Sequence, residues 1–451
     1  MFPLFSSVYC DKYLKIGGIF LSTILNVRKR GTKWEYRFEG AKINGKRNQI
    51  SKAGFKTQSE AIAAGNQALN EYNNSGLNIK PSTMSVTDFL NYWYENYAKV
   101  NLRYGTYTAY RNILDKHIIP RIGIYRLSSI TTPILQKMIN DIYCEKTFTK
   151  SYLKNILKVT KGAFKYAYKQ AKFTKSNPAD DLELPKYDSS AEKNKEKVLP
   201  IEDINKILER FKNTPYHYLA MYLAFHCGLR ISEVYGLTWD NIDFENKTLT
   251  INKIATKRNQ NAGTKKRGGI RGKAKTIWYM SPCKTPTSYR TIVIDDDLIT
   301  ELQKFKKWQD DNIENYGEYY IYQYLREVPD PDKPSKKLYQ VVSADSTIPV
   351  ALPKIDLIFT KDSGEYHGTD NMKYPSKIIH YELNIDFNFH SFRHTHATIL
   401  IENGANVKTV SERLGHSNIR TTLDTYTKNT IKMQNDAVDI FTNAINKGDN
   451  P

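Results

Sequence analysis

The 451-residue chain is strongly basic, because 67 lysines and arginines outnumber 47 aspartates and glutamates and give a net charge of +20. Such a balance favours a polyanionic partner, although a solvated basic surface would give the same count. No apolar stretch approaches the roughly 20 residues that a membrane-spanning helix needs, so no membrane contact is expected. The four cysteines have no paired spacing, which argues against a disulfide framework or a zinc ribbon and fits a reducing cytoplasm: Cys10, Cys144, Cys227 and Cys283.

Residues 1–24 open the chain with a moderately apolar stretch. Asp11, Lys12 and Lys15 interrupt it, and its start carries no charge. We therefore expect a poorly ordered leader rather than a signal peptide, and the true start codon stays open.

Residues 25–80 are predicted to form three short strands followed by a helix. Glycine permits tight hairpin turns at Arg30–Gly31 and at Asn44–Gly45. Thr57, with Glu60 three residues later, is typical of a helix start.

This first sheet is predicted to be basic, since ten lysines and arginines stand against two glutamates between Val27 and Lys56. Trp34, Tyr36 and Phe38 alternate with charged residues along one strand. One face could therefore lie in a major groove of DNA, or the aromatic side chains could form the core under the helix. The candidate DNA-binding residues are Arg28, Lys29, Arg30, Lys33, Arg37, Lys46 and Arg47.

Residues 82–174 are predicted to be a bundle of helices. Ser85 is placed to cap the first helix, whose apolar residues include Phe89 and Trp93 at helical spacing. Further helices are expected over residues 107–118, 133–143 and 151–171. Residues 175–198 are polar, contain prolines and lack periodicity, so they are predicted to be a flexible linker between domains.

Residues 199–451 are predicted to be a mainly helical domain with one small antiparallel sheet. A buried helix ends at Gly228, which leaves Arg230 projecting from a helix terminus. The segments FENKTLTI, TIWYM and YRTIVID are expected to be the strands of that sheet, with Lys284 on the hairpin between the last two.

Two insertions interrupt this last domain. Residues 253–275 hold nine basic and no acidic residues, together with four glycines, and are predicted to be a mobile loop that orders on phosphate. Residues 328–381 suggest no role. The candidate DNA-binding residues of the first insertion are Lys265, Lys266, Arg267 and Arg271.

The side chains needed to cleave a phosphodiester lie in three segments of this domain. Arg230 and Arg393 can stabilise a pentacoordinate phosphate, because the planar guanidinium matches its oxygens. The phenol of Tyr426 has an ordinary pKa of about 10, so it needs nearby positive charge and a proton acceptor such as His390. Lys284 could protonate the leaving 5′ oxygen. Such chemistry needs neither a metal nor a cofactor.

The segments HCGLRISEVYGLTW, HSFRHTHAT and LGHSNIRTTLDTY resemble the conserved segments of tyrosine recombinases, specifically phage and conjugative-transposon integrases. The resemblance rests on the H-x-x-R spacing, on His416 23 positions after Arg393, on Tyr426 ten positions later, and on an arginine segment about 160 residues upstream. It implies that Tyr426 forms a 3′-phosphotyrosine and that Arg230 and Arg393 hold the phosphate.

The resemblance also implies roles for the other site residues. His390 would accept a proton or donate a hydrogen bond, His416 would contact the phosphate, and Lys284 would be the general acid. Lys284 is chosen from several nearby lysines by its context after a strand. Glu233, three residues after Arg230, matches an acidic position that supports the site.

The resemblance assigns each domain a task on DNA. Residues 25–80 would be an arm-type DNA-binding domain, residues 82–174 a core-binding domain, and residues 199–451 the catalytic domain. A helix after Tyr426 would pack on its own domain or dock into a neighbouring protomer, and the sequence leaves both open.

Several of these residues also have ordinary structural interpretations. We expect His226, His394 and His396 to be core or capping residues. His390 and His394 have the i, i+4 spacing of a zinc site, but no glutamate follows His390 and a third ligand is missing, so zinc is not expected.

The expected function is that of a site-specific recombinase that integrates and excises a prophage or a conjugative transposon in the bacterial cytoplasm. Four copies would hold two double-stranded attachment sites and pass through a Holliday junction, with a DNA-bending host factor and an excision factor as further partners. The alternatives are the same chemistry used for chromosome-dimer resolution or DNA relaxation, an idle DNA-binding regulator, and a metal-dependent phosphodiesterase.

Overall fold

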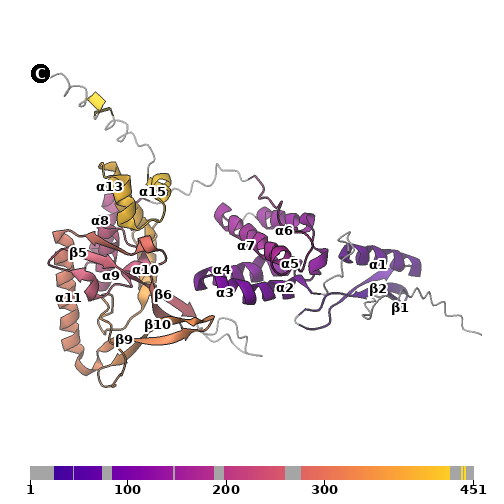
Figure 1. Cartoon of the computed structure of the whole chain (residues 1–451), viewed down its shortest axis with the longest axis horizontal. Helices are drawn as coiled ribbons and strands as arrows, with labels where there is room; N and C mark the ends of the chain where they lie inside the picture. The colour runs from indigo at the N-terminus through magenta and orange to yellow at the C-terminus, as the bar shows by residue number, and fades with distance from the viewer. Residues whose placement is uncertain are drawn as a thin grey trace, which may run out of the picture. The chain divides into compact units, whose positions relative to one another are not determined.

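The computed structural model describes residues 25–43, 45–73, 84–145, 148–186, 198–259, 276–426, 438–439 and 441–442. The predicted leader, the basic residues 265–271 and nearly all of the helix expected after Tyr426 lie outside this part. The chain divides into two compact units, Met1–Lys193 and Asn194–Pro451, and each is described by itself (Figure 1).

The first unit begins with the expected basic sheet and its helix. Strands β1 (Asn26–Arg30), β2 (Lys33–Glu39) and β3 (Gln49–Phe55) pair antiparallel in that order, and α1 (Gln58–Asn73) packs on one face. Tyr36 and Phe38 are buried under α1, so these two aromatic side chains are core residues. The capping box is confirmed, because the Glu60 N–H donates to Thr57 Oγ1 at 3.2 Å.

The remainder of the first unit is the expected helical bundle. Ser85 caps α2 by accepting from the Asp88 N–H at 3.0 Å, and the core gathers side chains such as Phe89, Trp93 and Phe164. Two π-helical turns, Tyr94–Ala98 and Leu114–Ile118, interrupt the helices. The α-helices are α2 (Val86–Trp93), α3 (Lys99–Asn101), α4 (Tyr104–Ile113), α5 (Ile119–Ile122), α6 (Thr132–Cys144) and α7 (Lys150–Lys169).

The first part of the predicted linker is not a flexible tether. Ala179 and Leu182 are buried in the core of the helical bundle. Lys161 Nζ also donates to the Asp180 carbonyl at 2.9 Å. Two apolar side chains within a polar, proline-containing stretch are enough to hold it against the helices, and the linker prediction was wrong for residues 175–186.

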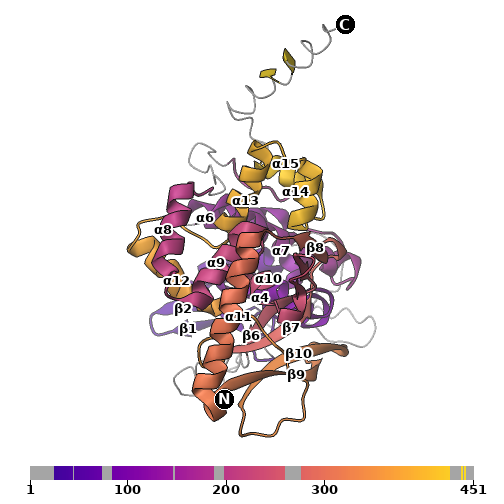
Figure 2. The same cartoon turned by 90° about the vertical axis from the view of Figure 1, so that its left-hand side faces the viewer.

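The second unit is built around α9 (Pro215–Cys227), whose apolar side chains are buried against α8, α11 and α13. Figure 2 shows these helices together. The remaining helices are α8 (Ile201–Phe211), α10 (Ile231–Val234), α11 (Asp296–Tyr316), α12 (Lys373–Tyr381), α13 (His390–Glu402), α14 (Val407–Leu414) and α15 (Ile419–Tyr426).

The described residues of this unit form two antiparallel sheets where the sequence predicted one. The first has the order β4 (Ile242–Asp243), β5 (Thr248–Ile251) and β8 (Arg290–Val293). The second has the order β6 (Lys253–Asn259), β7 (Thr276–Pro282), β10 (Lys333–Asp345) and β9 (Ile321–Asp330). The strand in TIWYM therefore does not pair with the strand in YRTIVID.

Both predicted insertions contribute to the second sheet. Residues 253–259 form strand β6, which pairs with β7 along its whole length, so the loop prediction was wrong for this part. Residues 328–345, the first third of the second insertion, complete the β9–β10 hairpin, whose strand β10 pairs with β7. Figures 1 and 2 both place this hairpin at the opposite end of the unit from α13 and α15.

Within the described residues, no helix is long and apolar enough to cross a membrane.

Candidate active site

Arg230 is the N-cap of the short helix α10 and lies three residues after α9 ends at Cys227. Gly228 ends α9 in the left-handed conformation with φ 64°, as the sequence predicted, and a Cβ there would lie 2.6 Å from Leu414. Arg230 Nη1 donates to Glu233 Oε1 at 2.7 Å, and the Arg230 N–H donates to Glu233 Oε2 at 3.0 Å. The Arg230 side chain keeps 34% of its surface exposed, so its guanidinium is both fixed and accessible.

Arg393 lies in the first turns of α13 and is completely buried. Its Nη1 donates to the Gly228 carbonyl and its Nη2 donates to the Leu414 carbonyl, both at 2.7 Å. These two bonds tie α13 to the end of α9 and to the end of α14. Arg393 therefore contributes positive charge from beneath the surface, while Arg230 presents its charge to solvent.

His390 is the first residue of α13 and is exposed. Desolvation by the surrounding protein, followed by the charges of His394, Arg393 and Arg230, lowers the pKa of His390 to about 4. The ring is therefore neutral at pH 7 and can accept a proton.

His416 follows Gly415, which ends α14 in the left-handed conformation. Its Nδ1 lies 2.8 Å from the buried Thr422 Oγ1 of α15. Burial, followed by the charges of Arg393 and Arg230, lowers the pKa of His416 to about 3. The contact with Thr422 fixes α15 to the site, and α15 ends at Tyr426, whose side chain lies outside the described part of the structure.

Lys284 lies on the connection between β7 and β8 and is exposed, but these strands belong to different sheets, so the predicted hairpin is not formed. The preceding residue, Cys283, is buried, and burial and the charge of Glu233 raise the pKa of its thiol. The connection therefore lies within electrostatic range of Glu233. The turn after Lys284 is held by the Thr285 and Ser288 hydroxyls, whose oxygens are 2.8 Å apart.

Arg290 belongs to this constellation and was not singled out from the sequence. Its Nη2 lies 3.0 Å from Glu233 Oε2, and its Nε donates to the Arg413 carbonyl at 2.6 Å. A signal was present in the period of two along β8, because Ile292 and Ile294 are buried and Arg290 shares their side of the strand. An arginine at an inward position of a strand needs a buried acidic partner.

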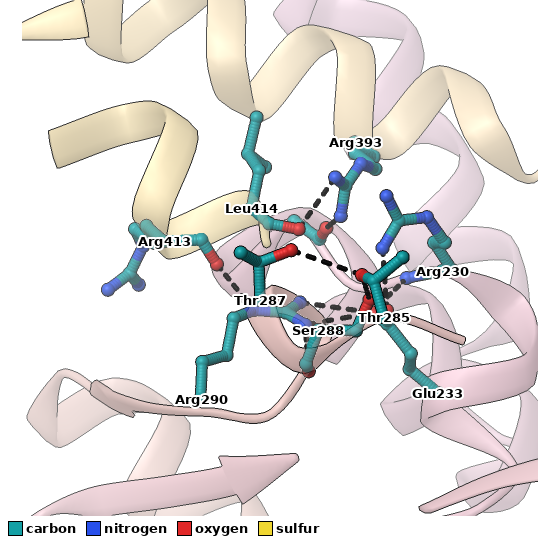
Figure 3. A network of polar contacts seen from close by, with 10 residues as sticks. Arg230, Glu233, Thr285, Thr287, Ser288, Arg290, Arg393, Arg413 and Leu414 are labelled. Carbon is teal, nitrogen blue, oxygen red and sulfur yellow. Dashed lines mark hydrogen bonds and ion pairs between the residues drawn. The ribbon is translucent and has the colours of Figure 1, made fainter. Parts of the chain in front are cut away.

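These contacts close into a ring, drawn in Figure 3. Arg393 donates to the carbonyl of Gly228, which lies two residues before Arg230 in the chain. Arg230 and Arg290 both donate to Glu233. Arg290 also donates to the Arg413 carbonyl, and the next carbonyl, that of Leu414, accepts from Arg393 and closes the ring. The ring balances three guanidinium groups against one carboxylate. Burial alone would raise the pKa of Glu233, but Arg290 and Arg230 outweigh it and hold that pKa below its usual range.

The other histidines have structural contacts. His226 Nδ1 lies 3.2 Å from Asp295 Oδ2, and the buried His396 accepts from Arg413 Nε at 3.3 Å. The rings of His390 and His394 meet edge to face with centroids 4.5 Å apart. In the described ranges, no three histidine, cysteine, aspartate or glutamate side chains gather closely enough to hold a metal.

The candidate DNA-binding residues of the first unit lie on two sides of its sheet. The pairing of β1 with β2 puts Arg28 opposite Glu35 and Arg30 opposite Lys33, on the face away from α1. Lys29 pairs with Trp34 and therefore points to the other side.

Arg37 shares the open face of the sheet with Arg28 and Arg30. Lys46 and Arg47 lie between β2 and β3, where Arg47 Nε donates to Glu39 Oε1 at 2.8 Å.

Three protein-family models match the chain. The phage integrase family model matches residues 197–268 and 332–433, a phage integrase N-terminal SAM-like domain matches residues 85–143, and an arm DNA-binding domain matches residues 26–72. Together these matches cover more than half of the 451 residues.

Two curated relatives resemble most of the chain. A protein of Caldanaerobacter subterraneus subsp. tengcongensis named tyrosine recombinase XerC-like is 28% identical over 389 residues, which span 85% of this chain and 89% of the relative. The ICEBs1 integrase of Bacillus subtilis is 24% identical over 339 residues, spanning 73% of this chain and 75% of the relative.

Solved structures share the fold. The Tn1549 transposon integrase in complex with transposon right end DNA matches with a TM-score of 0.57 and 20% identity, over 80% of this chain and all of that chain. The lambda integrase tetramer bound to a Holliday junction matches with a TM-score of 0.50 and 16% identity, over 90% of this chain and 97% of that chain.

Proposed function

As a member of the tyrosine recombinase, or phage integrase, family, the chain is a site-specific DNA recombinase, and we propose that it integrates and excises a mobile genetic element such as a prophage or a conjugative transposon. Two similar proteins support this task, because one is named the ICEBs1 integrase and the other is the integrase of the Tn1549 transposon. The arm DNA-binding match over residues 26–72 supports a second DNA contact outside the exchange site.

In the proposed cleavage step, the phenol oxygen of Tyr426 attacks the scissile phosphorus and the bond to the 5′ oxygen breaks. The phenolic proton passes to neutral His390, and Lys284 gives a proton to the departing 5′ oxygen, which leaves as a hydroxyl. Arg230 and Arg393 stabilise the charge on the non-bridging oxygens, with His416 as a further contact. The phosphate remains bonded to Tyr426 as a 3′-phosphotyrosine.

In the proposed rejoining step, a 5′ hydroxyl from the other duplex attacks this phosphotyrosine and the phenol leaves. The phosphodiester energy is kept in the phosphotyrosine, so the proposal assigns no cofactor. Four copies would hold two attachment sites and exchange strands through a Holliday junction on DNA in the bacterial cytoplasm, together with a DNA-bending host factor and an excision factor. The lambda integrase tetramer on a Holliday junction supports this arrangement by its fold.

The observation that carries this proposal is the ring of contacts between Arg393, Arg230, Glu233 and Arg290. Such a ring fixes positive charge before any substrate arrives, and preorganised charge is the main means of stabilising a phosphoryl transition state. His390, at the start of α13 and with its pKa lowered to about 4, is the proposed proton acceptor.

Covalent trapping tests the proposal. Supercoiled plasmid carrying the element's joined ends is incubated with the full chain in EDTA, and protein–DNA adducts are resolved on a denaturing gel. Wild type is expected to give an adduct, and Tyr426→Phe is expected to give none while still shifting the DNA.

The same experiment separates the alternatives. DNA binding without an adduct in wild type would favour an idle regulator, and cleavage only after a divalent metal is added would favour a phosphodiesterase. Relaxed plasmid without recombinant product would favour relaxation, and recombination confined to two directly repeated sites on one circle would favour dimer resolution.

A further inference from the structure

Arg290 connects three segments of the proposed catalytic centre. Its Nη2 contacts Glu233 of α10 at 3.0 Å, its Nε donates to the Arg413 carbonyl of α14 at 2.6 Å, and its Nη1 donates to the Ser288 carbonyl at 3.2 Å. The last contact is with the turn that follows Lys284. One guanidinium therefore joins three parts of the site: the helix that Arg230 caps, the helix end that holds Arg393, and residues 284–288. We call these last residues the Lys284 turn.

Arg290 is almost completely buried, and protein atoms already accept hydrogen bonds from its guanidinium. Only 6% of its side chain is exposed, and its partner Glu233 is 2% exposed. Gly415 packs on it so closely that a Cβ at this position would lie 3.0 Å from both Arg290 Nη1 and the Thr287 carbonyl. The end of α14, the Lys284 turn and Arg290 thus lie in direct contact.

We propose that Arg290 is a positioning residue that holds the Lys284 turn in place relative to Arg230 and Arg393. This inference rests on the proposed function, in which Lys284 protonates the leaving 5′ oxygen. Without the guanidinium of Arg290, the turn keeps the contact between the Thr285 and Ser288 hydroxyls but loses its link to α10 and α14. The arginines would still hold the phosphate, whereas the lysine would no longer be held close to the leaving oxygen.

The substitution Arg290→Lys tests this role because it keeps the positive charge and removes the planar guanidinium with its several donors. A lysine ammonium is a single donor centre and cannot reach Glu233, Ser288 and Arg413 together in the geometry of a guanidinium. We expect cleavage of ordinary DNA to slow by about 100-fold, the typical effect of displacing a catalytic group by about 1 Å. Binding of the core site is expected to stay within about twofold, because Arg290 is buried.

A substrate with sulfur in place of the bridging 5′ oxygen shows which function is lost. A thiol has a pKa of about 8.5, so the sulfur leaves as a thiolate without a proton from Lys284. Single-turnover cleavage of this substrate is expected to be slowed less than about tenfold by Arg290→Lys and also by Lys284→Ala. A poorly folded variant would be slow on both substrates, so the ratio of the two rates is independent of folding.

Arg210→Lys is the matched control. Arg210 also forms a two-pronged contact with a glutamate, Nε to Glu382 Oε1 at 2.6 Å and Nη2 to Glu382 Oε2 at 3.0 Å, but this pair is exposed. Neither substrate is expected to be cleaved more slowly by this variant.

Two results would overturn the inference. If sulfur rescues Lys284→Ala but not Arg290→Lys, Arg290 does not act through the lysine turn, and the proposed function stands. If wild type forms no covalent adduct on either substrate, the proposed function fails and the inference fails with it.

Discussion

Two regions of the molecule each set a pair of arginines against one buried glutamate, and they hold them in opposite ways. In the second unit, Glu233 contacts Arg290, which is 6% exposed, and Arg230, which is 34% exposed. In the basic sheet of the first unit, Glu35 contacts Arg28 and Arg30, whose side chains are 48% and 74% exposed.

The difference shows how the same residues can serve catalysis or binding. Backbone carbonyls and close packing hold Arg290 in one arrangement against Glu233, and Glu233 in turn binds Arg230. The arginines over Glu35 are screened by water and salt, and their exposed ion pairs are weak enough to rearrange toward phosphates. We therefore expect substitutions near Glu233 to change the cleavage rate and substitutions near Glu35 to change DNA affinity.

The largest effect is expected from Arg230→Ala. It removes the exposed guanidinium from the proposed phosphate site, and cleavage should fall by about 1000-fold, as when one donor to a developing oxyanion is lost. Single-turnover cleavage of a core-site duplex measures this effect. Arg210→Ala, on the exposed surface of the same unit, is the control, and equal rates for the two variants would show that Arg230 has no special role.

The two glutamates can be compared directly by Glu233→Gln and Glu35→Gln. Glu233→Gln leaves the buried Arg290 without its full counter-charge, so we expect a loss of about 3 kcal/mol in unfolding free energy and about 100-fold slower cleavage. Glu35→Gln removes a negative charge beside exposed arginines and should tighten binding of arm DNA without changing cleavage. Thermal melts, cleavage rates and filter binding measure these effects. Slower cleavage by Glu35→Gln would contradict the assignment of cleavage to the region around Glu233 and of DNA affinity to the region around Glu35.

Two glycines with similar backbones provide a second comparison. Gly228 and Gly31 have φ of 64° and 66°, but a Cβ at Gly228 would lie 2.6 Å from Leu414, whereas a Cβ at Gly31 would have no atom within 4 Å. Gly31→Ala should cost about 1 kcal/mol from the backbone alone, and Gly228→Ala about 3 kcal/mol because overpacking is added. Urea unfolding of the two variants checks this order, and similar losses would mean that the site is loosely packed.

The pH dependence of cleavage follows from His390. Its pKa is lowered to about 4, so the ring stays neutral and able to accept a proton down to that pH. Cleavage limited by this residue should not change between pH 7 and 5 and should fall about tenfold per pH unit below 4. A fall centred near pH 6.5 would indicate an ordinary histidine. The pKa of His390 is lower in the folded chain than in the unfolded chain, so protonation of His390 favours unfolding. The contribution of His390 to the free energy of unfolding is therefore complete above about pH 6.5 and is lost as the pH falls toward 4.

The sequence predicted local features of the fold well, because they depend on neighbouring residues. The Thr57 and Ser85 caps and the end of α9 at Gly228 follow from short-range hydrogen bonding and backbone conformation. The spacing of the motifs also identified residues that the structure brings together from α10 and α13.

The errors concern pairing between distant segments. Nothing local in TIWYM indicates that its strand pairs with β6 and β10 rather than with β8. Lys257 and Arg258 concealed the strand over residues 253–259, because the acidic partners of these two side chains lie far along the chain. Lys257 Nζ donates to Asp370 Oδ1 at 2.6 Å, and Arg258 Nη1 donates to Asp330 Oδ1 at 2.9 Å. Arg290 was missed because the partner that explains its burial, Glu233, lies 57 positions away in the chain.

The most direct test of the account is to identify the amino acid that is joined to DNA. The trapped adduct is digested with trypsin and nuclease, and the modified peptide is sequenced by mass spectrometry. We predict a 3′-phosphate ester on the phenol of Tyr426, with DNA binding retained and the adduct lost in Tyr426→Phe. A phosphate ester on any other residue, or cleaved DNA without a covalent protein adduct, would contradict the mechanism.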